Sequence, residues 1–309
     1  MYDIVLECRN LSHWFGNQKV LYDINLKVVR GEIVALVGPS GCGKSTLLRA
    51  ILGTHPPCSG QVLMNGQPIT GPSRERGMIY QRYSLFPYLT AQGNVAFGLM
   101  LDQAALHLRL FQFWKWRKLR KTHFEQAAEL LDQHGLDKAL HLYPSEMSGG
   151  MNQRVAIAQA LIMKPEILLL DEPFGALDEA TREEHQGMLL GLYQENLDAK
   201  KAGRKPPYTM IIVTHELNEA IYVSDRVVAL SQHWLWEEQH SQHPGATIVY
   251  DATAPVFPRD RVDKSRDFFQ QRTEIRQVAF DPSGRHKRGT FVRFWRECQE
   301  GKGVGVMQP

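Results

Sequence analysis

This sequence of 309 residues has few cysteines, a small net charge and no long apolar runs. Its four cysteines lie far apart without metal-ligand spacing, which indicates a reducing compartment and argues against a disulfide framework. The formal net charge of +3 is too small to indicate nucleic-acid binding by itself. No segment approaches the roughly 20 apolar residues of a membrane-spanning helix. Residues 1–7 also lack the features of a signal peptide, so we expect a cytoplasmic protein or one held at a membrane by a partner.

The clearest motif is a glycine-rich segment that joins an apolar run at 33–37 to a helical stretch at 47–52. The pattern G-x-x-x-x-G-K-[ST] in this context binds the phosphates of a nucleoside triphosphate, because glycine backbones and a helix N-terminus converge on the anion. We expect Lys44 to reach the β- and γ-phosphates and the Ser45 hydroxyl to bind Mg²⁺. The predicted phosphate-binding residues are Gly38, Pro39, Ser40, Gly41, Cys42, Gly43, Lys44, Ser45 and Thr46.

A second site is predicted where two further apolar runs end. The run at 167–170 suits a strand buried on both faces of a parallel sheet, and Asp171 and Glu172 follow at its C-terminal end, where such sheets bind ligands. We expect Asp171 to hold Mg²⁺, and Glu172 to orient and deprotonate the attacking water. The run at 209–213 leads to His215, which we expect to contact the γ-phosphate or that water.

The regions around these motifs are less specific. Residues 2–30 hold short strand-like runs separated by turns, a pattern typical of antiparallel hairpins. Trp14 and Phe15 lie beside the first turn, where a ring could stack on a purine base or belong to the core of a small sheet. Residues 108–121 mix aromatic and basic side chains. Such a stretch can lie on anionic lipid or on a partner protein, but a helix with one packed and one solvated basic face is the favoured interpretation.

With these motifs in place, the sequence resembles the ATP-binding subunit of an ABC transporter. A third motif, M-S-G-G-M-N-Q-R at 147–154, is similar to the family signature L-S-G-G-Q-x-Q-R and departs from it at Met147 and Met151. Ser148, Gly149 and Gly150 are retained; in this family they contact the γ-phosphate of ATP bound to the opposite subunit. Methionine in place of the usual glutamine resembles the branch that imports nitrate, taurine and sulfonates.

The resemblance covers about residues 3–231 and assigns further roles. It implies that Phe15, or Trp14 in its place, stacks on adenine, and that Gln81 links Mg²⁺ to the helical subdomain and takes part in catalysis. Asp178 matches the loop at the dimer seam that contacts the nucleotide, and His215 matches the switch histidine. The implied fold is an α/β P-loop NTPase core with an antiparallel β subdomain. A helical subdomain at about 85–163 is inserted in the ATP-binding domain at 1–231, and 232–309 form a C-terminal extension that we expect to be dispensable for ATP chemistry.

The function implied by the resemblance is that of an ATPase that drives a membrane importer. Two such subunits, identical or related, would enclose two ATP molecules with Mg²⁺ and push on separate permease subunits at the cytoplasmic face of the inner membrane. A periplasmic binding protein would deliver the solute, and nucleic acid would have no part. Nitrate, taurine, alkanesulfonates and other small solutes all remain compatible. The alternatives are the ATPase of a separate-subunit exporter and a soluble ABC ATPase, which the single phosphate loop and the importer-like segment at 84–99 disfavour.

Overall fold

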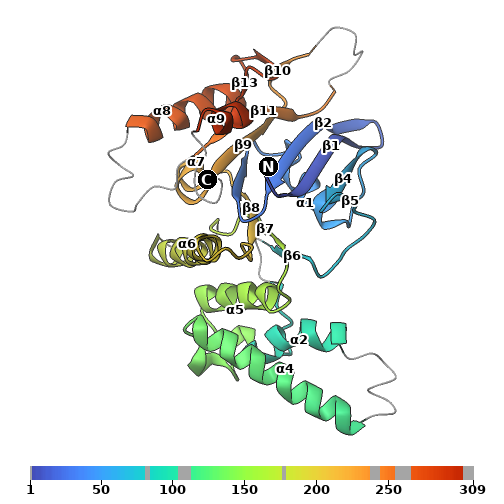
Figure 1. The fold of residues 1–309 in the computed structure, drawn as a ribbon, viewed down its shortest axis with the longest axis vertical. Helices are drawn as coiled ribbons and strands as arrows, with labels where there is room; N and C mark the ends of the chain where they lie inside the picture. The colour runs from blue at the N-terminus through green and yellow to red at the C-terminus, as the bar shows by residue number, and fades with distance from the viewer. Residues whose placement is uncertain are drawn as a thin grey trace.

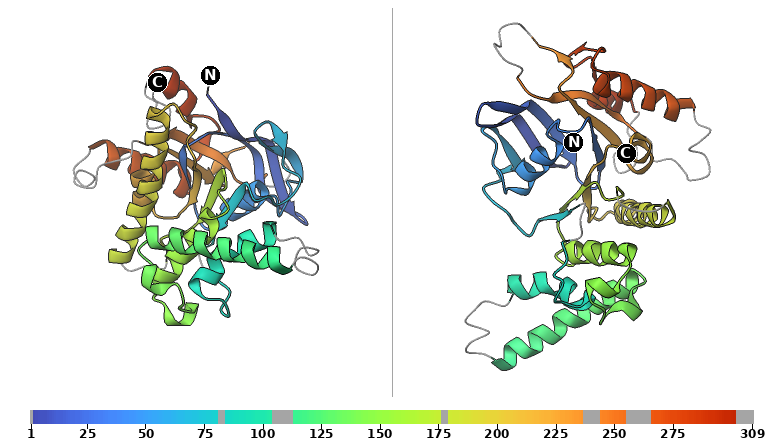
Figure 2. Two further views of the ribbon diagram at one scale, coloured as in Figure 1. Left: turned by 60° about the horizontal axis from the view of Figure 1, so that its bottom comes forward. Right: turned by 180° about the vertical axis from the view of Figure 1, so that it is seen from behind.

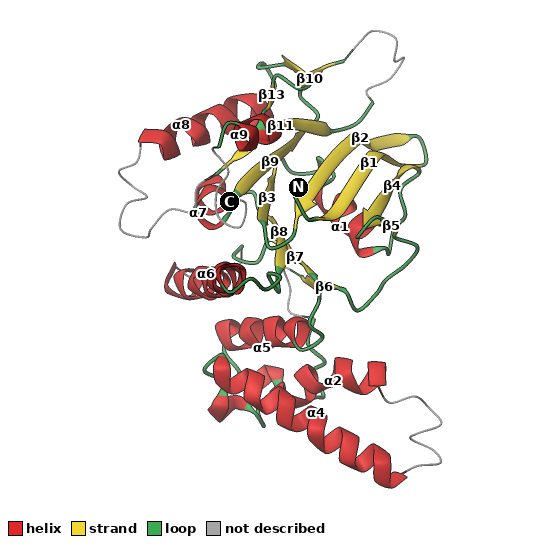
Figure 3. Cartoon of the chain, in the orientation of Figure 1, coloured by secondary structure: helices red, strands yellow, loops and turns green. Residues whose placement is uncertain are grey.

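The computed structural model describes residues 2–80, 84–103, 113–175, 179–236, 244–254 and 266–301. Figure 1 shows a central sheet with a small sheet on one side of it, helices on the other side, and a separate group of helices beyond one end. Figure 3 shows that the separate group beyond the end of the central sheet consists of helices and loops, without strands among its described residues. This arrangement is the α/β P-loop core with an antiparallel β subdomain and an inserted helical subdomain that the resemblance implied.

The small sheet is antiparallel, as the hairpin pattern predicted. Its strand order is β2-β1-β4-β5, and β1 and β2 form a long hairpin. Asn65 and Gly66 join β4 to β5 with φ of 49° and 77°, the two positive values that a tight hairpin turn requires. Its strands are β1 (Ile4–Phe15), β2 (Gln18–Val29), β4 (Ser59–Met64) and β5 (Gln67–Pro68).

The central sheet has the strand order β13-β11-β9-β3-β8-β7-β6. The five strands from β9 to β6 run parallel, whereas β11 is antiparallel to β9. All five residues of β3 are buried, because layers cover both faces of the sheet. The strands are β3 (Ile33–Val37), β6 (Arg76–Ile79), β7 (Ile167–Asp171), β8 (Thr209–Val213), β9 (Arg226–Ser231), β11 (Thr247–Thr253) and β13 (Phe291–Val292).

Alternate residues of the strands enter different cores. Val34 and Leu36 of β3 pack with α1 (Lys44–Leu52) and the small sheet. Ala35 and Val37 face the other way and pack with α7 (Leu217–Val223) and α8 (Arg266–Ile275), which lie with two further helices along the opposite face, as Figure 2 shows from behind. The two further helices are α6 (Glu179–Lys201) and α9 (Phe294–Gln299).

The helical part lies between β6 and β7 in the sequence. Its core consists of small and medium apolar side chains, such as Ala91, Ala127 and Val155, which let the helices approach closely. Within the described ranges of the chain, no helix has both the length and the apolar character needed to span a membrane. The elements of this part are α2 (Ala91–Gln103), α4 (Phe113–Gln133), α5 (Gly149–Leu161) and the 3₁₀ turns at Asp137–Ala139 and Pro144–Glu146.

The C-terminal segment contributes two strands, β11 and β13, to the central sheet. Strand β11 is hydrogen-bonded to β9 along its length, so the boundary placed at residue 231 falls between two neighbouring strands of one sheet. Six of the seven residues of β11 are buried, which places this strand in the core beside β9. The remaining elements are β10 (Trp234–Leu235), β12 (His286–Lys287) and a π-helical turn at Arg276–Phe280.

A fully buried arginine joins this segment to the core. Arg226 of β9 donates from Nε and Nη2 to the two carboxylate oxygens of Asp251 on β11, each at 2.6 Å. Its Nη1 donates to the Lys27 carbonyl oxygen at 2.8 Å and lies 3.4 Å from a Glu32 oxygen. The guanidinium carbon also lies 3.7 Å from the ring centre of Phe294 on α9, a cation–π contact. The extension therefore supplies partners that a buried cation requires.

Candidate active site

The glycine-rich segment forms the turn between β3 and α1. Gly38 has φ of 150°, and a Cβ there would lie 2.2 Å from the Leu230 carbonyl oxygen. Gly43 has φ of 94° and caps the N-terminus of α1, where a Cβ would lie 2.7 Å from Leu21 Cδ2. Because both positions combine left-handed backbone with a close neighbour, glycine is required at each. The turn presents its backbone at the N-terminus of α1, where an anion is favoured.

Lys44 places a cation on this turn. Its side chain is almost completely buried, and Nζ donates to the carbonyl oxygens of Gly38 at 2.7 Å and Pro39 at 3.1 Å. These bonds hold the ammonium against the loop and satisfy part of its hydrogen-bonding capacity away from bulk water. The arrangement provides a positive charge next to the backbone groups of the turn, and thus a site for phosphate.

Ser45 and Asp171 meet beside the loop, as the two motifs predicted separately. The Ser45 hydroxyl lies 3.5 Å from Asp171 Oδ1, although the two residues are 126 positions apart. Burial raises the pKa of Asp171, the Glu172 charge adds to that rise, and the bond from Ser45 opposes it. A bound cation would offset both the burial and the repulsion between the carboxylates.

One hydroxyl and one carboxylate are a donor set that fits Mg²⁺, which keeps several waters and takes further oxygens from phosphates. In the part of the chain that the structure describes, no cluster of three or more histidine, cysteine or carboxylate side chains could hold a metal alone. The residues present therefore suit a metal that arrives with a nucleotide.

Glu172 and His215 face each other at the ends of β7 and β8. These strands are paired, with Asp171 opposite Val213, so the residues that follow them lie at one edge of the sheet. His215 Nδ1 lies 3.2 Å from Glu172 Oε1, and the Glu172 N–H donates to the Val213 carbonyl oxygen at 2.8 Å. The backbone of Glu172 has φ of 49°, a left-handed conformation that is uncommon outside glycine and concentrates at functional sites. The carboxylate is thus held beside an orienting histidine.

The two aromatic candidates lie at the exposed end of β1. Phe15 is 49% exposed and Trp14 is 41% exposed, so neither belongs to the core of the small sheet. The Phe15 ring contacts the ring of His13 edge to face, with 4.7 Å between centroids. Both aromatic rings are accessible to a planar ligand.

The signature motif begins α5 in the helical part. Ser148 caps this helix, its Oγ accepting from the Met151 N–H at 3.2 Å, and Gly149 and Gly150 form the first turn. Figure 1 shows α5 in the helical part, on the far side of the central sheet's β6 and β7 from α1. Met147 is buried and Met151 packs against the same helical core, so both departures from the family pattern fill that core.

Gln153 makes a further contact at the site, and the sequence motifs did not predict it. Its buried side-chain amide on α5 donates to the Pro173 carbonyl oxygen, directly after Glu172. The signature helix is therefore tied to the segment that carries the candidate base. The position of Gln153 within the signature motif is the feature of the sequence that could have indicated a role at the site. Gln81 and Asp178, two further predicted site residues, lie outside the described residues.

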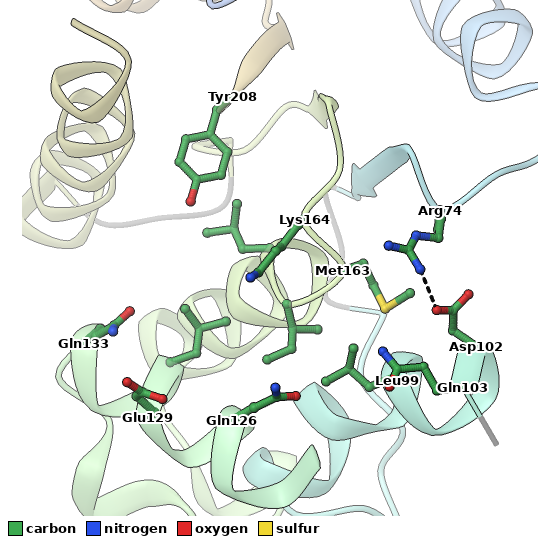
Figure 4. Close-up of a pocket in the computed structure, with 13 residues that line it drawn as sticks. Arg74, Leu99, Asp102, Gln103, Gln126, Glu129, Gln133, Met163, Lys164 and Tyr208 are labelled. Carbon is green, nitrogen blue, oxygen red and sulfur yellow. Dashed lines mark hydrogen bonds and ion pairs between the residues drawn. The ribbon is translucent and has the colours of Figure 1, made fainter. Parts of the chain in front are cut away.

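A separate hollow of about 510 Å³ lies between the helical part and the core. Lys164 precedes β7 and Tyr208 precedes β8, so the hollow is at the opposite ends of these strands from Asp171 and His215. Figure 4 shows Arg74 of the core reaching Asp102 of α2 across it, at 2.8 Å. It is therefore distinct from the phosphate site.

Comparison with known proteins identifies the family. Residues 21–175 match the family model described as ABC transporter. The chain belongs to the ABC transporter family. It is an ATP-binding subunit of the importer type, and it binds and hydrolyses ATP.

Two relatives match over most of the chain. An aliphatic sulfonates import ATP-binding protein of Bacillus thuringiensis subsp. konkukian is 38% identical, over 89% of this chain and 95% of its own length. A nitrate import ATP-binding protein of Synechococcus elongatus is 41% identical over 84% of each chain.

Two solved structures share the fold. The first is cbiO1 from Clostridium perfringens, part of the ABC transporter complex cbiONQ, at a TM-score of 0.63 and 22% identity, covering 89% of this chain and 96% of its own. The second is the ATP-binding cassette MJ0796, a dimeric post-hydrolysis state bound to ADP and Pi. It has a TM-score of 0.60 and 25% identity, covering 82% of this chain and 100% of its own.

Proposed function

We propose that this ABC subunit powers the uptake of a small oxyanion, an aliphatic sulfonate or nitrate, through separate permease subunits. The observation that carries the proposal is the match, over most of its length, to subunits named for sulfonate and nitrate import. A periplasmic binding protein would deliver the solute, and the ATPase would be peripheral at the cytoplasmic face of the inner membrane. The methionine at position 151, typical of this importer branch, is consistent with the assignment.

In the proposed mechanism the turn at 38–46 binds the ATP phosphates, and Lys44 neutralises the charge that spreads over the transferred phosphoryl group. Ser45 and Asp171 would hold Mg²⁺, which would help to neutralise the charge of the phosphates when it is bound with the nucleotide. Phe15 stacks on the adenine. These groups position the nucleotide beside the edge of the sheet where β7 and β8 end.

Glu172 is the proposed general base for the attacking water. His215 lies within hydrogen-bonding distance of its carboxylate, at 3.2 Å, and keeps it directed toward the phosphate site. The left-handed backbone at Glu172 fixes the direction in which this side chain leaves the strand. Gln81 would couple the metal site to the helical part.

The second half of each site would come from another subunit. Ser148, Gly149 and Gly150 offer a hydroxyl and a helix N-terminus to a phosphate, but they lie in a different part of the fold from Lys44. A second ATP-binding subunit, with Asp178 at the seam, would bring its signature motif to this phosphate loop. The bond from Gln153 to the Pro173 carbonyl oxygen would then couple closure of the two subunits to the position of the candidate base.

The test is ATP hydrolysis by the complete transporter in lipid vesicles, with its binding protein loaded in turn with taurine, an alkanesulfonate or nitrate. The expected result is that one solute raises the hydrolysis rate and accumulates on the side of the ATPase subunits. A complex with Glu172→Gln is the control, because it should bind ATP without transport. Accumulation on the opposite side would refute import, and indifference to every oxyanion would refute the solute class.

A further inference from the structure

We propose that the first three turns of α4 bind the anionic phospholipid headgroups of the membrane. The surface concerned, called the basic-aromatic face below, consists of Trp114, Arg117, Lys118 and Lys121. These positions are spaced i, i+3, i+4 and i+7, so their side chains project from one side of the helix. The proposed function does not assign this surface a role, but it places the chain beside a membrane and so supplies the setting on which the inference rests.

The charge of this segment is of one sign. Residues 113–122 contain five basic residues and no acidic ones. The first carboxylate is Glu125, whose oxygen lies 3.7 Å from Lys121 Nζ in an exposed pair of the kind that contributes little. Clusters of four to eight cations on an amphipathic helix are the pattern that attracts anionic lipid. The basic residues are Lys115, Arg117, Lys118, Arg120 and Lys121.

Trp114 adds an aromatic ring among these charges. It is 77% exposed, which is the largest exposed fraction of any large hydrophobic side chain in the described part of the chain. An exposed indole costs free energy in water, but it is favoured at the headgroup level of a bilayer, where the ring meets apolar chains and its N–H meets polar groups. A ring flanked by cations is therefore suited to a surface that is both anionic and partly apolar.

The segment is placed where a flat surface can reach it. Among residues 114–133 of α4 the buried positions are His123, Ala127 and Leu131, and residues 114–122 are exposed except for the half-buried Trp116 and Leu119. Figures 1 and 2 show the beginning of α4 as the tip of the helical part, at the end away from the central sheet. The helix thus continues about two turns beyond the layer that it packs on.

Arg120 contacts two aromatic rings on the side of the helix next to this face. The Arg120 guanidinium carbon lies 5.6 Å from the Trp116 ring centre and 5.2 Å from that of Phe124. Arg120 and Phe124, with the basic-aromatic face, line a shallow hollow of about 560 Å³. A hollow lined by four cations and two aromatic rings suits a phosphate headgroup with the start of its acyl chains.

Charge complementarity alone would also admit an acidic protein surface or a nucleic acid. The lipid surface is favoured because an exposed tryptophan beside cations suits the boundary between anionic headgroups and apolar chains, where indole rings are enriched. In addition, the net charge of the chain is only +3, which gives the molecule as a whole little attraction for a polyanion.

The test is flotation of the full-length chain with vesicles of phosphatidylcholine, alone or mixed with phosphatidylglycerol. The chain should float with the anionic vesicles only, and less as salt is raised. Replacing Lys118 and Lys121 by glutamine should weaken the partition coefficient by roughly thirtyfold, from two charges near an anionic surface. The variant Trp114→Ala should weaken it at every salt concentration. Replacing the exposed Lys138 and Lys201 by glutamine is the control with the same change in net charge, and it should leave partitioning unchanged.

Equal flotation of the two glutamine variants would overturn the proposal, as would flotation with neutral vesicles at the same level. Failure to float, with capture of the chain by an oligonucleotide or an acidic peptide, would assign the face to that other ligand and equally overturn it. ATP hydrolysis by the assembled transporter is measured in parallel, and it should persist in the Lys118/Lys121 variant. A loss of oxyanion transport with intact vesicle binding would refute the proposed function alone.

Discussion

Removing the Asp251 carboxylate should destabilise the whole ATP-binding domain, although the residue lies beyond residues 3–231, which carry the sequence motifs of the ABC family. Asp251 forms two 2.6 Å hydrogen bonds to Arg226, which is fully buried in β9. In Asp251→Ala the guanidinium would keep only the Glu32 oxygen at 3.4 Å as an anionic partner, with the Lys27 carbonyl oxygen and the Phe294 ring. Two of its donors would then face a small apolar side chain.

The expected loss in the free energy of unfolding follows from the Arg226 charge that stays buried without its main partner. Removing one partner of a buried ion pair typically costs about 3–5 kcal/mol, because the remaining charge stays desolvated. Since Glu32 still offers a longer contact, we expect about 3 kcal/mol, at the lower end of that range. Domains are stable by only about 5–15 kcal/mol, so this loss is a large fraction of the total.

The measurement is urea unfolding of the full chain, followed by circular dichroism. The matched control is Glu7→Ala, which removes surface ion pairs to Arg9 at 2.6 Å and to Lys27 at 3.4 Å and should cost much less. By the same reasoning, deletion of 233–309 should prevent folding, which reverses the expectation from the sequence that this segment is dispensable. An Asp251→Ala protein within about 1 kcal/mol of the parent, or a truncated chain that still binds ATP, would refute the argument.

Further outcomes are expected at the active site and in the core. Glu172→Gln should lower phosphate release by about 10²–10⁴-fold with ATP binding retained, and a rate above about a tenth of the parent contradicts a general base. Lys44→Ala should raise the Kd for ATP, so an unchanged titration argues against its phosphate contact. Adding Ser148→Arg to the Glu172→Gln chain should abolish ATP-dependent dimerisation in sedimentation; a dimer that still forms counts against a shared site. Burial raises the pKa of Asp225 to about 8 from 3.8, so the folded state holds an extra proton between these values. Its contribution to stability is therefore full below about pH 4 and is lost as the pH rises through about 8. Asp225→Asn should remove that slope from urea unfolding measured at several pH values, and an unchanged slope would mean that Asp225 does not titrate in this range.

The parts of the site that could be predicted are those encoded by adjacent residues. The apolar run at 33–37 and the glycines before Lys44 specify the local structure of the phosphate loop. The apolar run before Asp171 likewise indicates a buried strand with a carboxylate at its end. The meeting of Ser45 with Asp171 at 3.5 Å also followed, because parallel strands place their C-terminal ends at one edge. The exposure of Trp14 and Phe15 did not follow, since alternation in a strand does not say which face another layer covers.

The sequence by itself determined the family, the phosphate loop, the order of the motifs and the type of each element that carries them. These depend on short-range backbone preferences and on residues that contact the same ligand. Only the tertiary structure decided that β11 completes the central sheet and that Gln153 reaches the Pro173 carbonyl oxygen. It also decided that Arg226 requires Asp251, and that α4 extends beyond its packing layer. These features arise from contacts between segments far apart in the chain, whose pairing depends on burial and geometry that no local pattern records.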